Sequence, residues 1–298
     1  MTSDTQPAMP HDQPVIPIET RDGHSFELIH VRASDAMARL LFLPGMGLSA
    51  RQYISFAQAL AGWRVDTLIH EWRGLGSSNL RASRGTDWGY RELLIDDLAA
   101  SIEQSLDMSP NLPLLVGGHS LGSQLALLAA AMRPDKIRGL LIVAGGAPYW
   151  RCFNGWMRYA LHGIFFAMPN VARLVGHYPG RRLGFAGREA RGVMTDWAQS
   201  GKTGMYRPEN MEFDFESALG KVQTPMLSLN MTDDWFVPQA SVDWLTGKLT
   251  SADKQEIQIS NEGMRASSDH YQWMKEPDTS AAAIGHWVAA QWPANNRP

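Results

Sequence analysis

The stretch Leu114-Leu115-Val116-Gly117-Gly118-His119-Ser120-Leu121-Gly122 joins an apolar run to a segment with helical periodicity. Residues 114–117 are typical of a short buried strand, and residues 121–132 predict a helix that ends before Pro134. Gly118 and Gly122 permit a sharp turn that pushes the side chain of Ser120 into the open. This strand-turn-helix context favours Ser120 as a nucleophile over the alternative, an ordinary serine that caps a helix N-terminus.

The alternation of strand and helix extends on both sides of this stretch. Residues 15–20 and 26–32 flank a turn and predict a hairpin, and the apolar run 39–43 predicts a strand covered on both faces. Strands that alternate with helices pair in parallel. We therefore expect an α/β protein with a mostly parallel sheet and helices on both faces. Further strands are predicted at 65–70, 139–144, 225–230 and 256–260, and further helices at 90–106, 239–249 and 279–292.

The alternation of strands and helices stops between residues 147 and 220, where aromatic residues are frequent and the sequence is typical of helices. We predict a helical cap over 147–220, inserted into a core of residues 15–146 and 221–298, with a flexible leader over 1–14. Our hypothesis is that the cap forms an apolar pocket above Ser120. A second interpretation, ranked below the first, is contact with a membrane surface, because Arg151, Arg158 and Arg173 lie among the aromatics.

Composition narrows the class of function. Hydrophobic residues make up 44% and charged residues 19%, the balance of an ordinary globular protein. A net charge of −3 offers no basic field for a phosphate backbone, so we expect no nucleic-acid partner. Residues 1–13 lack an export signal, and no apolar run approaches the roughly 20 residues of a membrane span, so the cytoplasm is the expected location. Cys152 is the single cysteine, and we interpret it as an inert packed side chain.

A serine nucleophile needs an acid downstream to orient its base. Serine is a poor nucleophile at neutral pH, so an imidazole must take its proton and a carboxylate must stabilise the resulting cation. The strand 225–230 ends in Met231-Thr232-Asp233-Asp234-Trp235-Phe236-Val237-Pro238. We favour Asp234 over Asp233, because the spacing D-x-x-x-P to Pro238 is usual for such a loop. The alternative is that both acids only solvate a turn.

Only two of the nine histidines follow this acid. His270 lies after the strand 256–260, on a loop from which it can reach Ser120, and we favour it as the base. His286 lies in the predicted last helix, where packing or solvent exposure explains it. We expect His119 to support the turn rather than to transfer protons. The other histidines show no paired metal spacing, so we infer no metal.

A tetrahedral intermediate also needs backbone N–H donors for its oxyanion. One usually comes from the residue after the nucleophile, and the other from a loop after an early strand. Leu121 and Met46 fit these positions. Gly45 and Gly47 frame Met46 and let its loop approach closely, although glycines also end strands without further purpose.

In this order the motifs resemble those of the α/β-hydrolase superfamily: the loop Pro44-Gly45-Met46-Gly47, the turn Arg73-Gly74-Leu75-Gly76-Ser77, the elbow at Ser120, and the acid and histidine loops. The resemblance covers nearly the whole chain and implies an eight-stranded, mostly parallel sheet with a helical cap after the sixth strand. Within the superfamily the chain resembles little-characterised predicted hydrolases whose cap carries a Gly-rich segment, here 184–187, followed by Trp197. Two positions depart from the commonest pattern, since no histidine precedes Gly45 and Asp269 replaces the usual glycine before the histidine.

The resemblance and the residues together predict a serine hydrolase of carboxylic esters or thioesters that needs no cofactor. A serine at the elbow argues against epoxide and haloalkane hydrolysis, because relatives with those activities carry aspartate there. Two alternatives stay open: an acyltransferase that uses the same three residues, and a catalytically silent fold that binds a small ligand.

Overall fold

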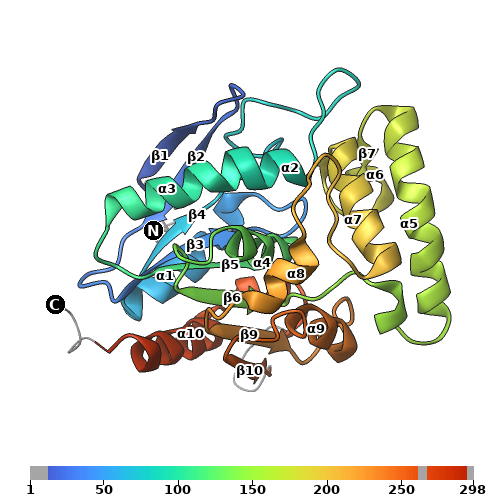
Figure 1. Cartoon of the computed structure of the whole chain (residues 1–298). Helices are drawn as coiled ribbons and strands as arrows, with labels where there is room; N and C mark the ends of the chain where they lie inside the picture. The colour runs from blue at the N-terminus through green and yellow to red at the C-terminus, as the bar shows by residue number, and fades with distance from the viewer. Residues whose placement is uncertain (1–12, 261–266, 294–298) are drawn as a thin grey trace, which may run out of the picture.

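The computed structural model of the chain describes residues 13–260 and 267–293 (Figure 1). Most of the predicted leader, and residues 261–266 of the loop before His270, lie outside the described residues. Eight strands form one sheet in the order β1-β2-β4-β3-β5-β6-β9-β10. β1 with β2 and β2 with β4 pair antiparallel, whereas the other neighbours pair in parallel. The predicted fold class is confirmed.

The strands of the sheet are β1 (Val15–Glu19), β2 (Ser25–Val31), β3 (Ala38–Leu43), β4 (Val65–Ile69), β5 (Leu114–His119), β6 (Gly139–Val143), β9 (Met226–Met231) and β10 (Lys254–Ile259). The helices are α1 (Ile54–Gly62), α2 (Tyr90–Glu92), α3 (Leu98–Met108), α4 (Leu121–Met132), α5 (Gly155–Val175), α6 (Gly180–Leu183), α7 (Arg191–Thr203), α8 (Phe215–Lys221), α9 (Gln239–Thr246) and α10 (Asp278–Gln291).

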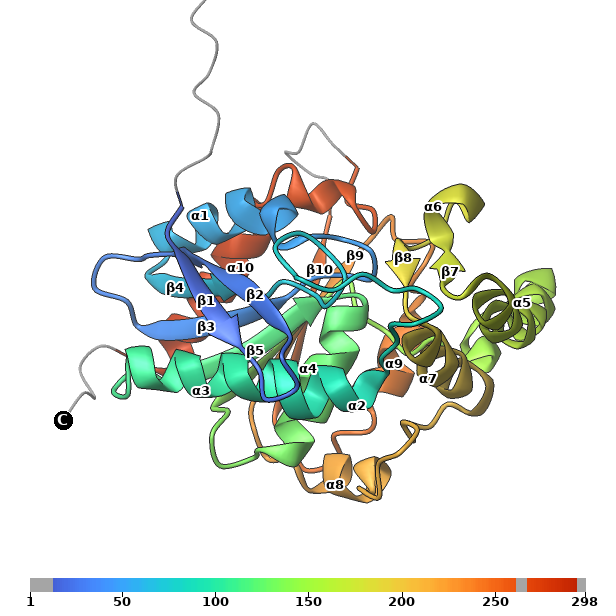
Figure 2. The ribbon, with the colours of Figure 1, turned by 90° about the horizontal axis from the view of Figure 1, so that it is seen from above.

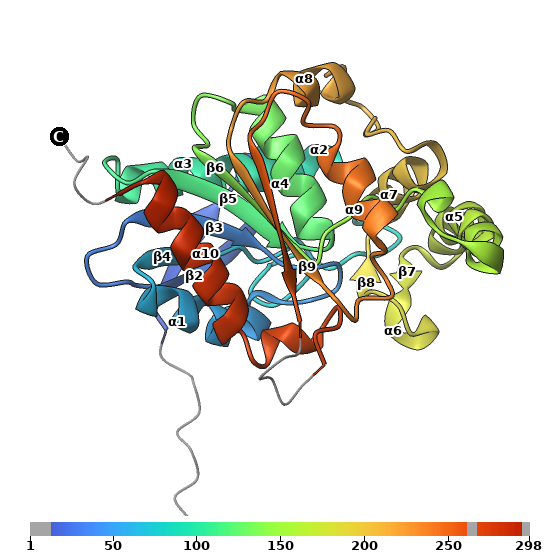
Figure 3. The same ribbon diagram turned by 90° about the horizontal axis from the view of Figure 1, so that it is seen from below.

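The central strands are buried on both faces because their side chains alternate between two cores. In β3, Leu40 and Phe42 pack with residues of α1 and α10, whereas Leu41 and Leu43 pack with residues of α3 and α4. All four side chains are fully buried. Figures 2 and 3 show these helix pairs on opposite sides of the sheet. A continuous apolar run therefore becomes a strand between two helical layers.

The segment between β6 and β9 holds the helices α5 to α8 and a small antiparallel ladder of β7 (Tyr178–Pro179) and β8 (Arg188–Glu189). α5 packs along α7, and α8 lies against α4 of the core. Figure 1 shows α5, α6 and α7 together at one side of the sheet. Among the described helices, none is both long enough and apolar enough to cross a membrane.

The sequence did not predict a π-helical turn at Leu93–Asp97, between α2 and α3. Its last residue, Asp97, is fully buried and accepts hydrogen bonds from Arg73 at 2.6 Å and from His24 at 2.9 Å. A buried carboxylate is tolerated only with such partners. The hydrophobic periodicity of the sequence does not reveal a single π-helical turn. The hydrogen-bond partners of Asp97 come from distant parts of the chain, so they could not be predicted either.

Candidate active site

Ser120 stands at a sharp turn between β5 and α4. Its backbone has φ of 53° and ψ of −114°, a conformation that L-residues rarely adopt. A Cβ atom at Gly118 would lie 2.6 Å from the carbonyl oxygen of Leu43, and one at Gly122 would lie 2.1 Å from the same oxygen. Both glycines are therefore required for the turn to pack against the end of β3. The strain, of order 1–3 kcal/mol, is held in place by this close packing.

The structure brings Ser120, His270 and Asp234 into one hydrogen-bonded chain. The hydroxyl of Ser120 lies 3.1 Å from Nε2 of His270, and Nδ1 of His270 lies 2.7 Å from Oδ2 of Asp234. The second oxygen of Asp234 accepts hydrogen bonds from the amides of Phe236 and Val237 at 2.9 and 3.1 Å. His270 and Asp234 are both buried. The carboxylate fixes Nδ1 as the protonated nitrogen, which leaves Nε2 free to accept the serine proton.

The competing acids and base point elsewhere. The carboxylate of Asp233 accepts hydrogen bonds from the hydroxyls of Ser267 and Ser268. Asp269 accepts hydrogen bonds from the amides of Tyr271 and Gln272. His286 lies in α10, where its ring packs on Trp63. Of the alternatives raised by the sequence, the structure brings only Asp234 and His270 to Ser120.

The loop after β3 lies beside the turn at Ser120. The amide of Gly45 donates to the hydroxyl of Tyr53 at 2.9 Å, and this hydroxyl donates to Nδ1 of His119 at 2.8 Å. Burial, together with the neighbouring ring of His270, holds the pKa of His119 well below its usual range, so the ring is neutral and can accept. His119 thus supports the loop after β3, whereas the sequence led us to expect support of the turn at Ser120.

The two predicted oxyanion donors are the amide of Met46, which lies in this loop, and the amide of Leu121, which directly follows the turn at Ser120. Leu121 is the first residue of α4, so its amide has no acceptor within the helix. The amide of Met46 makes no hydrogen bond to another of the described residues. Gly47 has φ of 75°, and a Cβ there would lie 2.4 Å from the amide nitrogen of Gly187 in the cap. The glycine therefore lets the cap touch the backbone next to Met46.

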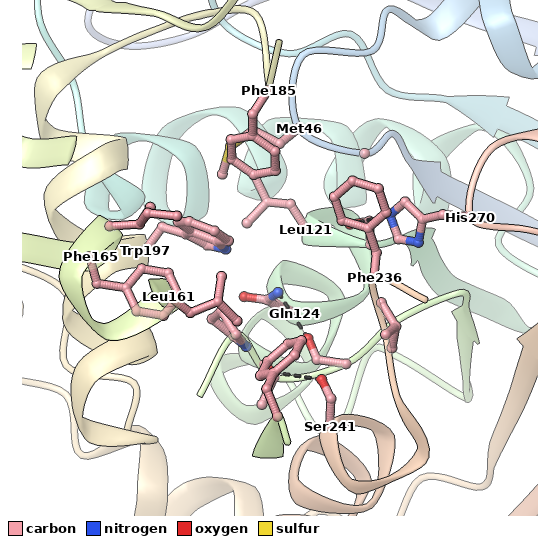
Figure 4. A pocket seen from close by; sticks show the side chains of 18 of the residues that line it. Met46, Leu121, Gln124, Leu161, Phe165, Phe185, Trp197, Phe236, Ser241 and His270 are labelled. Atoms are coloured by element: carbon pink, nitrogen blue, oxygen red, sulfur yellow. Dashed lines mark hydrogen bonds between the residues drawn. The ribbon is translucent and has the colours of Figure 1, made fainter. Parts of the chain in front are cut away.

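Ser120 is one of the residues that line a cavity of about 410 Å³. Figure 4 shows this pocket from close by. The residues around it come from the cap, from α4 and from the segments that follow β3, β5, β6, β9 and β10. Most are apolar, among them Met46, Leu121, Phe153, Leu161, Phe165, Phe185, Trp197 and Phe236. The aromatic segment thus lines a pocket beside Ser120, with side chains from α5 and α7 and with Phe153 and Phe185 outside these helices.

Three residues at the site were missed by sequence reasoning. Phe236 stacks on the ring of His270 with centroids 5.3 Å apart, and Tyr53 holds the loop at Gly45. Gln124 lines the pocket one helical turn after Ser120. The place of Gln124 in the first turn of α4, directly after the turn at Ser120, was a usable signal. Nothing in the sequence near Tyr53 marked its contact.

Cys152 is buried and unpaired, as the sequence suggested. Burial raises the pKa of its thiol to about 11, with the negative charge of Asp243 adding to the effect. The thiol therefore stays protonated near neutral pH and is a poor nucleophile.

The fold and this site together define the class: the chain has the α/β-hydrolase fold and is a hydrolase. A family model described as serine aminopeptidase, S33, matches residues 34–179. This region begins before β3 and includes the loop at Met46, the turn at Ser120 and α5. It ends before the loops that carry Asp234 and His270.

Individual relatives and structures agree with this assignment. A putative carbamate hydrolase, RutD, from Caulobacter segnis is 26% identical over 258 residues, which cover 80% of this chain and 89% of the relative. Monoglyceride lipase from Rattus norvegicus is 27% identical over 126 residues, which cover 41% of this chain and 40% of the lipase. A haloalkane dehalogenase loop variant, DbeA-M1, from Bradyrhizobium elkanii has a TM-score of 0.64 at 18% identity, covering 95% of this chain and 99% of that chain. This last likeness is one of fold.

Proposed function

We propose that this hydrolase cleaves carboxylic esters or thioesters with an apolar acyl or aromatic group, through an acyl-serine intermediate. The observation that carries the proposal is the hydrogen-bonded chain from Ser120 through His270 to Asp234, at the floor of an apolar cavity. The chemistry requires no cofactor.

In the first half of the reaction the oxygen of Ser120 attacks the ester carbonyl while Nε2 of His270 takes the hydroxyl proton. Asp234 stabilises the imidazolium that forms. The oxyanion of the tetrahedral intermediate then accepts hydrogen bonds from the amides of Met46 and Leu121. Nε2 next gives its proton to the leaving alcohol or thiol as the bond to the carbonyl carbon breaks.

In the second half water takes the place of the alcohol. His270 removes a proton from the water, whose oxygen attacks the acyl-serine carbonyl. The same two amides hold the second oxyanion. Collapse of this intermediate releases the carboxylic acid and returns the proton to Ser120. Proton uptake and release balance over the two halves.

The lining of the cavity supports an uncharged substrate. None of its described lining residues is aspartate, glutamate, lysine or arginine. A charged group brought into such surroundings would lose its hydration without finding a partner. An acyl chain or an aromatic ring would instead gain about 25 cal/mol for each Å² of apolar surface that it buries.

A fluorophosphonate probe and an ester panel test the proposal. We expect the probe to label the wild-type protein and to leave Ser120→Ala unlabelled. With p-nitrophenyl esters and thioesters of increasing chain length, Ser120→Ala serves as the blank, and its turnover should fall on the order of 10³-fold or more. Equal labelling of both proteins would contradict the proposal. A sharp preference for acetate over hexanoate would contradict a roomy acyl pocket.

Two other functions use the same fold. An acyltransferase would pass the acyl group from Ser120 to an alcohol or amine, and product analysis with and without an added acceptor separates it from a hydrolase. A silent ligand-binding protein would leave wild-type Ser120 unlabelled by the probe. We rank the silent protein below the esterase, because the three side chains already have the geometry of proton transfer. An acyltransferase would share this geometry, so the product analysis decides between it and the esterase.

A further inference from the structure

Three aromatic residues lie next to the proposed base, where they line the same cavity as Ser120. The ring of Phe236 stacks on that of His270 with centroids 5.3 Å apart, and Trp235 packs on Phe236 with centroids 3.9 Å apart. The ring of Tyr271 meets that of His270 edge to face, with centroids 4.8 Å apart. We call Trp235, Phe236 and Tyr271 the aromatic rim.

The aromatic rim is accessible to a bound molecule. Trp235 is 67% exposed, Tyr271 is 39% exposed, and Phe236 is half-buried. Phe165 and Met168, which line the cavity from the cap, are by contrast buried. Exposed apolar side chains that adjoin one another beside a cavity are typical of ligand-binding grooves, whereas single exposed ones are common everywhere. A ligand in the cavity can therefore cover the rim and remove its apolar surface from water.

The proposed reaction fixes which part of a substrate reaches the rim. The leaving oxygen or sulfur takes its proton from Nε2 of His270, so an oxygen must come within about 2.6–3.2 Å of that nitrogen. The oxyanion points towards the two backbone amides, and the acyl group takes the remaining direction. Figure 4 shows Phe236 beside His270, with the cap side chains Leu161 and Phe165 on the opposite side of the pocket. The alcohol or thiol part of the substrate therefore lies along the rim, and the acyl part lies towards the cap.

An aromatic ring is the group that suits this rim best. Aromatic rings attract one another in offset-stacked and edge-to-face arrangements, which a saturated ring of the same size cannot reproduce. The rings of Phe236 and Tyr271 stand at 77° to each other, so the rim offers ring faces in both orientations. The rings of Trp235, Phe236 and Tyr271 pack against one another rather than across a gap, so they do not form the cage that holds a quaternary ammonium group.

We propose that the aromatic rim is the subsite for the leaving group, and that it selects esters or thioesters whose alcohol or thiol carries an uncharged aromatic ring. Trp235 is the specificity-determining residue, because it presents the most exposed ring surface of the three. The inference rests on the proposed function and narrows it, since that function leaves open which side of the ester bears an aromatic group.

Matched substrates test this on the wild-type protein. Benzyl hexanoate and cyclohexylmethyl hexanoate give the same acyl-serine and differ only in the ring of the leaving group. Each kcat/KM is divided by the rate constant for hydrolysis of the same ester by hydroxide, which removes the difference in intrinsic reactivity. We expect the corrected value for the benzyl ester to be about threefold to tenfold higher, the order of magnitude of one aromatic pair. A ratio of one or less would overturn the proposal, because the saturated ring buries at least as much apolar surface.

The variant Trp235→Leu assigns the preference to the rim, because leucine is apolar without an aromatic face. We expect the benzyl to cyclohexylmethyl ratio to fall towards one. Ethyl phenylacetate and ethyl cyclohexylacetate carry the same two rings on the acyl side, and their ratio should stay as in the wild type. A merely structural role of Trp235 would lower all four rates together and leave both ratios unchanged. That result, or a change in the acyl-side ratio, would contradict the proposal.

Phe213→Leu is the matched control. Phe213 is 38% exposed and is not among the described residues that line the cavity, so both ratios should stay as in the wild type. A fall of the benzyl ratio in this variant as well would contradict the assignment to the rim. If Trp235→Leu does not fold, Tyr271→Leu provides the same comparison, and the wild-type ratio alone already decides between the outcomes.

The two proposals fail in different ways. If the wild-type protein hydrolyses none of the esters and the fluorophosphonate probe does not label Ser120, the esterase proposal is wrong. If it hydrolyses the hexanoate esters and is labelled at Ser120 but shows no preference for the benzyl ester, only the role of the aromatic rim is wrong.

Discussion

Asp233 and Asp234 are adjacent in the sequence, yet their carboxylates have different partners. Asp234 contacts the ring of His270 and two backbone amides, whereas Asp233 contacts the hydroxyls of Ser267 and Ser268. Residues 232 and 233 form a turn after β9, and the two successive side chains leave it in different directions. The two residues therefore offer a matched pair for testing the proposed acid.

We expect Asp234→Asn to lower kcat by about 10³- to 10⁴-fold, because an amide cannot hold His270 in the required tautomer. Asp233→Asn should retain at least a third of wild-type kcat, roughly, since its hydroxyl partners can bond to an amide as well. Steady-state kinetics with p-nitrophenyl hexanoate measure both. A larger loss in Asp233→Asn than in Asp234→Asn would contradict the assignment.

Glu71 is a buried carboxyl group that takes no part in the proposed reaction. It is 3% exposed and accepts hydrogen bonds from the amides of Ala50 and Trp72 at 3.2 to 3.4 Å. Burial raises its pKa to about 7, and the amides, Arg51 and Arg81 only partly oppose this effect. Because the folded-state pKa lies above the unfolded value of about 4.5, folding is favoured while the group is protonated.

The stability that Glu71 provides should therefore be full below about pH 4.5 and lost as the pH rises through about 7. We expect the melting temperature of the wild type to fall between pH 5 and pH 8 more steeply than that of Glu71→Gln, whose side chain does not titrate. Calorimetry at several pH values measures both slopes. Parallel curves would show that Glu71 is not the titrating group.

Among individual residues, the sequence predicted those that belong to short motifs in a fixed order along the chain, such as Ser120, Asp234 and His270. It could not predict Tyr53, because that hydroxyl reaches Gly45 and His119 only after the sheet has formed.

At the scale of elements, the turn before β8 packs directly on the loop after β3. The backbones of Gly187 and Gly47 are in contact. The carboxylate of Glu189 accepts a hydrogen bond from the amide of Gly187 at 2.9 Å. The sequence predicted the strands of the main sheet and the helices α4, α9 and α10 to within a few residues, because their periodicity is local. For α5 and α7 it predicted helical structure without bounds. This contact between two turns could not be predicted, since it depends on how the cap lies over the sheet.

Gly47→Ala should disturb this contact. Alanine at positive φ is strained, and its Cβ would press on the backbone of Gly187. We expect kcat/KM to fall about 10- to 100-fold through displacement of the neighbouring Met46 amide. The control is Gly163→Ala in α5, where a Cβ meets open space and helix propensity favours alanine. It should keep full activity with unchanged or slightly higher melting temperature. Equal activity in the two variants would contradict the prediction.

At the scale of the whole molecule, charge and apolar surface are unevenly distributed. The chain has a net charge of −3, yet the segment 147–188 contains no aspartate or glutamate. Along α5 the side chains of Trp156, Tyr159 and Leu174 are 74%, 70% and 74% exposed. The arginines of the segment are Arg151, Arg158, Arg173, Arg181, Arg182 and Arg188. Basic and aromatic side chains together suit an anionic lipid surface.

This distribution makes the membrane interpretation of the cap testable. We expect the protein to co-sediment with vesicles of phosphatidylcholine and phosphatidylglycerol, to bind less to phosphatidylcholine alone, and to dissociate at high salt. Trp156→Ser combined with Tyr159→Ser should weaken binding, whereas Ile95→Ser, an exposed residue outside the cap, should leave it unchanged. No sedimentation with either kind of vesicle would exclude lipid contact.

The insertion of the cap between β6 and β9 also sets an order in time. Ser120 precedes the cap in the chain, and His270 follows it 150 residues after the serine. A ribosome makes the N-terminal part first, and domains begin to fold during synthesis. A nascent chain would thus hold its serine hydroxyl without a base until β10 and the loop beyond it have emerged. During that interval the hydroxyl stays unreactive, so the newborn chain would be protected from acylation before its fold is complete.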